Sequence, residues 1–195
     1  MGDKKRKLLL TLLIVGVLGS LAAFGTYSAF TATTSNNNNS FAAGTVKIED
    51  AGGQVTALFN NVTNQGPGVG TQRCIRVLYS GSLASTVHMY LAAAVTNGNK
   101  FNVTVDRGHG LTTPANRDCT GFVSDTNAFA TAGFNTFPIT YGAGLAGKDT
   151  DAAWAQNDTI DYRITLSPVD DATPNAHTSA VSTGTFSLTW EARNN

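Results

Sequence analysis

Apolar side chains at every second position are the feature that most limits how this chain folds. Strict alternation is the mark of a half-buried antiparallel strand, which turns one face to a core and the other to water. No long amphipathic helix pattern follows residue 24, and Gly, Asn, Asp and Pro turns separate the segments. The sequence therefore predicts an all-β, two-sheet, jelly-roll-like antiparallel sandwich, with a closed barrel as the alternative. The predicted strands are 41–48, 54–59, 74–79, 86–92, 101–105, 160–166 and 186–190.

The middle of the chain is less regular. Residues 118–148 are rich in glycine and phenylalanine. A short helix is predicted over 125–132, with Ser124 as its N-terminal cap because a hydroxyl there accepts a bond from a free backbone N–H.

The N-terminus has the order of a secretory signal. Lys4 to Lys7 are basic, residues 8–24 are almost entirely apolar, and small residues follow. A permanent membrane anchor is the alternative, although 17 residues are at the lower limit for spanning a bilayer. Small residues allow cleavage after Ala22 or Ser28, and a cut after Ala29 would make Phe30 the new N-terminus. The predicted parts are a signal helix over 1–29, a Thr/Ser/Asn-rich segment over 30–40 and a β-domain over 41–195.

Charge and cysteine content are those of an exported protein. Removing residues 1–29 takes four basic residues and one acidic residue from thirteen of each, which leaves 166 residues with a net charge of −3. Such a surface does not attract nucleic acid. The two cysteines, Cys74 and Cys119, are predicted to form a disulfide, with two buried free thiols as the alternative.

Motifs for catalysis or metal binding are missing from the sequence. His88, His109 and His177 lack the spacing of a helical zinc site, and no Gly-x-Ser-x-Gly occurs. Carboxylates are frequent at Asp149, Asp151, Asp158, Asp161, Asp170 and Asp171. Calcium binding and acid–base catalysis are the alternatives there, and solvated turn residues are the favoured interpretation. We expect no catalytic residue, no metal and no cofactor, hence no enzyme.

The opening stretch carries a family resemblance. Gly25-Thr26-Tyr27, then a Thr/Ser/Asn tract, then Phe41, Ala43, Gly44 and Thr45, resembles the TasA/camelysin family. That resemblance implies a SipW-type signal peptidase that cuts near Ala29 and Phe30, a jelly-roll domain, and a secreted or cell-surface protein. It also implies a subunit of extracellular matrix fibres in a biofilm, and membrane contact only through an uncleaved signal.

The favoured hypothesis is a fibre subunit whose partners are copies of itself. The N-terminal segment would add as a strand to a neighbour's sheet. The six residues of this assembly strand are Phe30, Thr31, Ala32, Thr33, Thr34 and Ser35. A plain spacer is the alternative for this segment. For the whole protein, one alternative is a carbohydrate-binding adhesin that uses Trp154, Tyr141 and Tyr90. The other is a camelysin-type metallopeptidase, for which the sequence offers no zinc motif.

Overall fold

The computed structural model describes residues 2–25, 43–53, 57–60, 62–63, 65–169 and 182–194. The chain divides into two compact units, residues 1–42 and 43–195.

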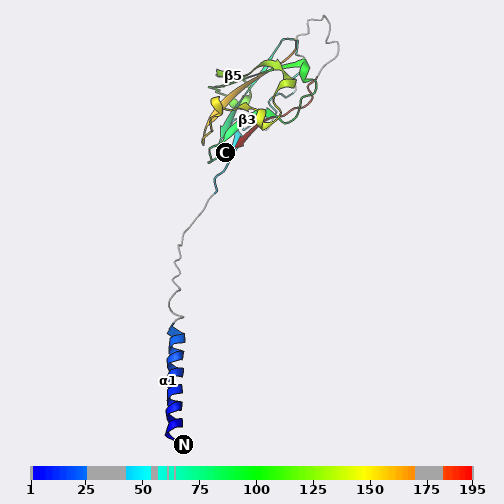
Figure 1. Cartoon of the computed structure of the whole chain (residues 1–195). Coiled ribbons are helices and arrows are strands. Elements are labelled where there is room, and N and C mark those ends of the chain that lie inside the picture. The colour runs from blue at the N-terminus through cyan, green and yellow to red at the C-terminus, as the bar shows by residue number, and fades with distance from the viewer. Residues whose placement is uncertain are drawn as a thin grey trace. The chain divides into compact units, whose positions relative to one another are not determined.

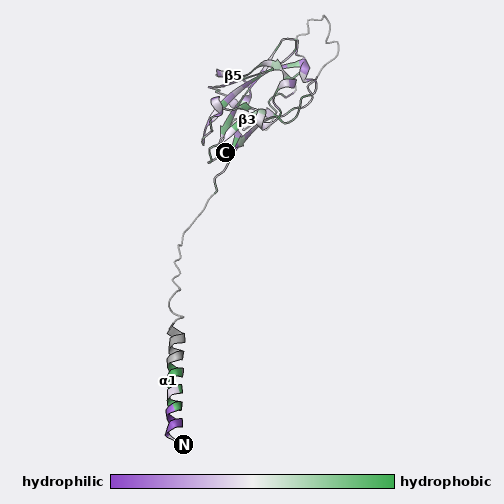
Figure 2. Cartoon of the chain, viewed as in Figure 1, coloured by the Kyte–Doolittle hydropathy of each residue, from purple (hydrophilic) through white to green (hydrophobic). Residues whose placement is uncertain are grey.

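The first unit contains one helix, α1 (Asp3–Gly25). Its first turns are basic and the turns that follow are apolar, as the colours of Figure 2 show. Within the described residues, no helix is long and apolar enough to cross a membrane. A helix therefore lies where the signal helix is predicted, and its role in export stays a prediction.

The second unit consists of two antiparallel sheets (Figure 1). The five-stranded sheet has the order β1 (Ile48–Asp50), β2 (Thr71–Tyr79), β7 (Thr159–Pro168), β4 (Phe101–His109), β5 (Val123–Gly133). The three-stranded sheet has the order β6 (Leu145–Ala146), β3 (Thr86–Leu91), β8 (Leu188–Arg193). Five 3-10 turns lie between strands: η1 (Gly98–Lys100), η2 (Pro114–Asn116), η3 (Phe134–Thr136), η4 (Tyr141–Ala143) and η5 (Asp149–Asp151). The predicted all-β, two-sheet architecture is confirmed.

The core is formed by the alternate side chains of both sheets. The five-stranded sheet supplies Ile75, Val77 and Tyr79 from β2, Val103 and Val105 from β4, and Tyr162 and Ile164 from β7. The three-stranded sheet supplies Val87, Met89 and Leu91 from β3. The loop residues Phe134, Phe137 and Trp154 complete it. These faces are the ones that the alternation predicts for β3, β4 and β7.

Two predicted strands at the start of the domain are wrong in part. β1 covers Ile48–Asp50 and not 41–48, because its partner β2 ends at Tyr79 and the chain then turns. Residues 43–47 instead make single hydrogen bonds to that turn, such as Leu83 N to Thr45 O at 3.1 Å. Residues 57–60 are not a strand, and 54–56 lie outside the described residues.

The predicted helix over 125–132 is also wrong. Those residues belong to β5, in which Ser124 pairs with Gly108 of β4. Pairing with β4 overrides the local preference of an alanine-rich segment. The register is broken in three places, and Gly108 has no room for a side chain because a Cβ there would lie 1.9 Å from Val123 O. β5 is thus an irregular edge strand.

Candidate functional site

The two sides of β3 differ, and the difference defines the candidate site. On one side β3 pairs with β8 along its whole length, from Thr86 with Arg193 to Leu91 with Leu188. On the other side it pairs with the two residues of β6. Among the described residues, β8 has no ladder partner besides β3, and we call its other side the open edge.

A hollow of about 1260 Å³ adjoins this open edge of β8. Leu188 and Trp190 line it from β8, and Ile75 and Leu166 line it from the five-stranded sheet. Leu58, Phe59, Phe101 and Phe186 add to its apolar lining, and the basic residues Lys100 and Arg117 also line it. An unpaired strand edge beside an apolar hollow can receive both the backbone and the alternate side chains of an added strand.

Residues 138–154 cover the opposite edge of β3, and we call this segment the strap. Leu91 N donates to Pro138 O at 2.8 Å, and Gly147 N donates to Val87 O at 2.7 Å. At its far end, Ser85 and Trp154 exchange two backbone hydrogen bonds of 3.2 and 2.7 Å. Gly147 has to be glycine, because a Cβ would lie 2.8 Å from the Trp154 ring and 2.9 Å from Val87 O. This edge of β3 is sealed by an irregular segment.

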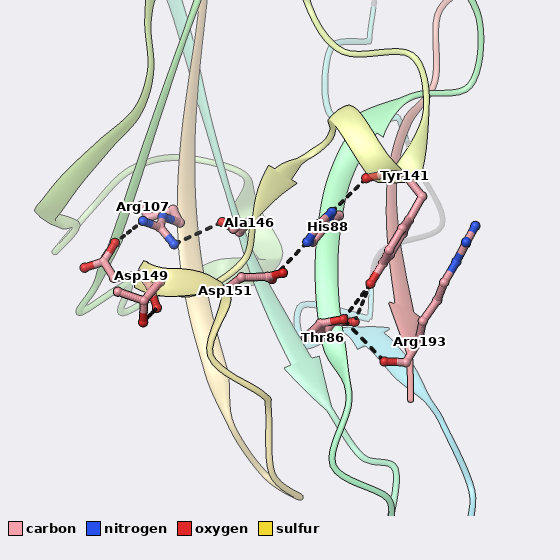
Figure 3. Close-up of polar contacts among 9 residues, drawn as sticks. Thr86, His88, Arg107, Tyr141, Ala146, Asp149, Asp151 and Arg193 are labelled. Atoms are coloured by element: carbon pink, nitrogen blue, oxygen red, sulfur yellow. Dashed lines mark hydrogen bonds and ion pairs between the residues drawn. The ribbon is translucent and has the colours of Figure 1, made fainter. Parts of the chain in front are cut away.

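Ion pairs tie the strap to both sheets (Figure 3). Arg107 of β4 pairs with Asp149 and donates to Ala146 O at 3.0 Å. On β3, His88 Nε2 lies 2.9 Å from Asp151 Oδ1, and its Nδ1 lies 2.7 Å from Tyr141 O. The turn η5 therefore joins a residue of the five-stranded sheet to a residue of the three-stranded sheet.

The ring of Tyr141 is already in contact with two neighbouring side chains and offers no free surface on which a sugar could stack. It stacks on His88, with centroids 4.3 Å apart, and Arg193 lies 4.0 Å from its centroid. Trp154, the largest aromatic proposed for sugar binding, is fully buried and belongs to the core. Tyr90 is half-buried, and its hydroxyl donates to Glu191 at 2.5 Å. The structure does not bring these three side chains together as a binding surface.

Glu191 links β8 to β3 on the same face. Arg193 and Tyr90 both donate hydrogen bonds to its carboxylate. These bonds, the one from Arg193 most of all, hold the pKa of Glu191 below its usual range. The same contact raises the pKa of the Tyr90 hydroxyl, because an adjacent carboxylate disfavours its ionisation.

The carboxylates that cluster in sequence each pair with a different basic side chain. Asp149 pairs with Arg107, Asp151 with His88, Asp158 with Lys148, and Asp161 with Arg76. Within the described residues, no group of three or more His, Cys, Asp or Glu side chains is placed to hold a metal ion. His109 pairs with Asp125 on the surface, while His177, Asp170 and Asp171 lie outside the described residues.

The predicted disulfide between Cys74 and Cys119 is confirmed. It fastens the loop of residues 110–122 to β2, on the outer face of the five-stranded sheet. Under that loop, Asp161 is 1% exposed and accepts hydrogen bonds from Arg76, at 2.6 and 2.7 Å, and from Leu111 N at 2.7 Å. The hydrogen bond to Asp161 raises the pKa of Arg76. This network holds the loop in place, and Arg117 of the same loop lines the hollow beside β8.

Most of the residues predicted for export and assembly lie outside the described residues. They are Thr26, Tyr27, Ala29, Phe30, Thr31, Ala32, Thr33, Thr34, Ser35 and Phe41. Gly25 ends α1, and Ala43, Gly44 and Thr45 begin the second unit as exposed coil. Gly44 packs so closely on Leu83 that a Cβ would lie 2.3 Å from Leu83 Cδ2. The described part of the motif therefore positions the chain against the turn after β2.

Comparison with known proteins adds no family. No family model matches the chain, and no curated protein matches it.

The sequence analysis did not predict the contact between Arg107 and Asp149. Arg107 stands at a position where alternation places an inward side chain, beside Val105 and Val103. A basic residue in phase with buried valines needs a hydrogen-bonding partner, and that signal was available. The partner itself is 42 residues away and follows from tertiary structure alone.

Proposed function

We propose that this protein is a secreted structural subunit that polymerises by donating residues 30–35 to a neighbour. The open edge of β8, with an apolar hollow beside it, is the observation that carries the proposal. β8 spans six residues, and so does the alternating segment from Phe30 to Ser35. A strand of that length would pair along β8 and direct Phe30, Ala32 and Thr34 into the hollow.

Charge and composition suit the same task. The segment 30–35 is uncharged and rich in threonine, so a strand made from it adds no buried charge. Trp190 and Leu188 offer apolar surface to its alternate side chains. Main-chain hydrogen bonds would supply affinity, and the hollow would supply register.

The other strand edges are less suitable as acceptors. β1 has three residues, and β6 has two. β5 has eleven residues, but its pairing with β4 is broken in three places, and such bulges twist an edge away from regular pairing. We therefore place the acceptor at β8. We also propose the jelly-roll class that the TasA/camelysin resemblance implies, on the support of the two antiparallel sheets.

The test is assembly of the chain that begins at Phe30, compared with a chain that lacks residues 30–35. We expect the first to form filaments in electron microscopy and light scattering. The second should keep the same circular dichroism spectrum and remain monomeric. Equal filament formation by both chains, or by neither, would reject strand donation and leave the segment a spacer.

A single substitution sharpens this test. Ala32→Pro removes a backbone donor and fixes φ, so it should block assembly, whereas Ala32→Ser keeps the donor and should assemble normally. If the two variants assemble alike, backbone pairing at this segment does not drive the polymer.

A further inference from the structure

We propose that the strap, residues 138–154, is a releasable cover over one edge of β3. The two side-chain pairs made by Asp149 and Asp151 in the turn at 148–151 hold it closed, and we call them the catch. The inference concerns the sealed edge of β3 and does not depend on donation to β8.

The strap is firmly attached at its ends and weakly attached between them. Phe137 precedes it and is 3% exposed, while Trp154 ends it and is fully buried. Between these anchors, most residues are exposed or half-buried, and regular pairing with β3 is limited to His88 with Ala146 and Met89 with Leu145. Segments with few buried contacts open locally at a lower free energy than the whole domain unfolds. The middle of the strap can thus detach while both anchors stay in the core.

The catch lies in this weakly attached middle (Figure 3). Asp149 pairs with Arg107, whose side chain is 10% exposed, and Asp151 pairs with His88, whose side chain is 12% exposed. The carboxylates are two residues apart, and their partners stand on β4 and β3, which belong to different sheets. Loss of either pair leaves a nearly buried basic group without its carboxylate, so both pairs favour the closed strap.

Backbone strain in the same turn opposes closure. Thr150 and Asp151 have φ of 58° and 54°, in the left-handed region that side-chain-bearing residues avoid. Thr150 is β-branched, which makes the conformation most unfavourable there. Strain of this kind persists only where surrounding contacts enforce it. Here the two ion pairs enforce it, and their release would let the turn relax.

Opening would expose the edge of β3. Val87 O would lose Gly147 N as its partner, and β6 would leave His88 and Met89. The result is an exposed edge over Val87, His88 and Met89 that faces water for as long as the strap is open.

Amide hydrogen exchange with mass spectrometry on the full chain tests the proposal. Asp149→Asn removes the charge of the pair with Arg107 at a residue outside the left-handed region. We expect severalfold faster exchange in peptides that cover 86–91 and 141–148, because the Asp149 side chain is 72% exposed and such a pair contributes at most about 1 kcal/mol, while the thermal midpoint moves little. Asp125→Asn is the matched control, because Asp125 pairs with His109 at 3.0 Å on the open surface, outside the strap. Equal exchange in the two variants would overturn the catch.

A second pair of variants tests the strain and does not depend on the first. Thr150→Asn places a residue that tolerates the left-handed region at the strained position, so exchange in the same peptides should slow severalfold. Thr140→Asn makes the same chemical change within the strap at an extended position (φ −138°) and should leave exchange unchanged. Unchanged or faster exchange in Thr150→Asn, or equal slowing in both variants, would overturn the proposal.

Discussion

The two edges of the three-stranded sheet face the same physical problem and meet it differently. The strap covers the edge of β3. It makes backbone hydrogen bonds at Pro138, Gly147 and Trp154, and two side-chain pairs hold its turn. The edge of β8 has a hollow beside it and, among the described residues, no ladder partner besides β3. A protein that covers one edge so thoroughly has the means to prevent strand addition. The difference suggests that the open edge is kept for a partner strand.

The largest effect that separates the two edges is expected from their tryptophans. Trp154 anchors the strap and is fully buried, so Trp154→Ala should cost toward the upper end of roughly 3–5 kcal/mol of unfolding free energy. Trp190 lines the hollow and is half-buried, so Trp190→Ala should cost less but should weaken assembly. Urea unfolding and light scattering on both variants measure this. Equal losses of stability would mean that the two edges are packed alike.

The disulfide should separate stability from assembly. It closes 45 residues, so replacing Cys74 and Cys119 together by serine should cost about 4 kcal/mol in the chain-entropy model. The bridge itself lies on the outer face of the other sheet, and the loop that it fastens reaches the hollow through Arg117, so the variant should still assemble at temperatures where this loop stays folded. Loss of assembly in a fully folded variant would show that the β8 edge alone does not control polymerisation. Thiol labelling of the unfolded, unreduced wild type should find no free cysteine.

The smallest effect concerns the pH dependence of the link between β8 and β3. The folded-state pKa of Glu191 is lowered by Arg193 and Tyr90, so its contribution to stability is present above the ordinary glutamate range. That contribution is lost as pH falls through the folded-state value. Since the pair is largely solvated, the contribution is at most about 1 kcal/mol. Urea unfolding between pH 3 and 7 should show a shallower acid decline for Glu191→Gln than for wild type, and parallel curves would contradict this.

The sequence was sufficient for the parts of the fold that local pattern determines. β3, β4 and β7 alternate strictly because one face of each is buried, so their positions and inward faces were predictable. β5 was not predictable, because its strand state comes from pairing with β4 rather than from its own alanine-rich sequence. The ends of β1 also depend on a partner, since β2 turns away after Tyr79.

The candidate site was less accessible to sequence reasoning than the fold. An open edge is a property of the order of strands in a sheet. No local sequence pattern reveals that β8 is the last strand in the order β6-β3-β8. The ion pairs of the strap join residues 42 and 63 positions apart. The sequence did indicate the disulfide, because an even number of cysteines in an exported chain favours pairing.

Cross-linking between two differently labelled subunits tests the central claim most directly. One chain beginning at Phe30 carries Thr33→Cys, and a second carries Thr189→Cys on the outward face of β8; both keep the native disulfide. Thr131→Cys on β5, the other long edge strand, is the matched control acceptor. Strand donation to β8 predicts that the Thr33→Cys chain forms intermolecular disulfides with the Thr189→Cys chain and not with the Thr131→Cys chain. Cross-links to β5 alone, to both strands equally, or to neither would contradict the assignment of β8 as the acceptor.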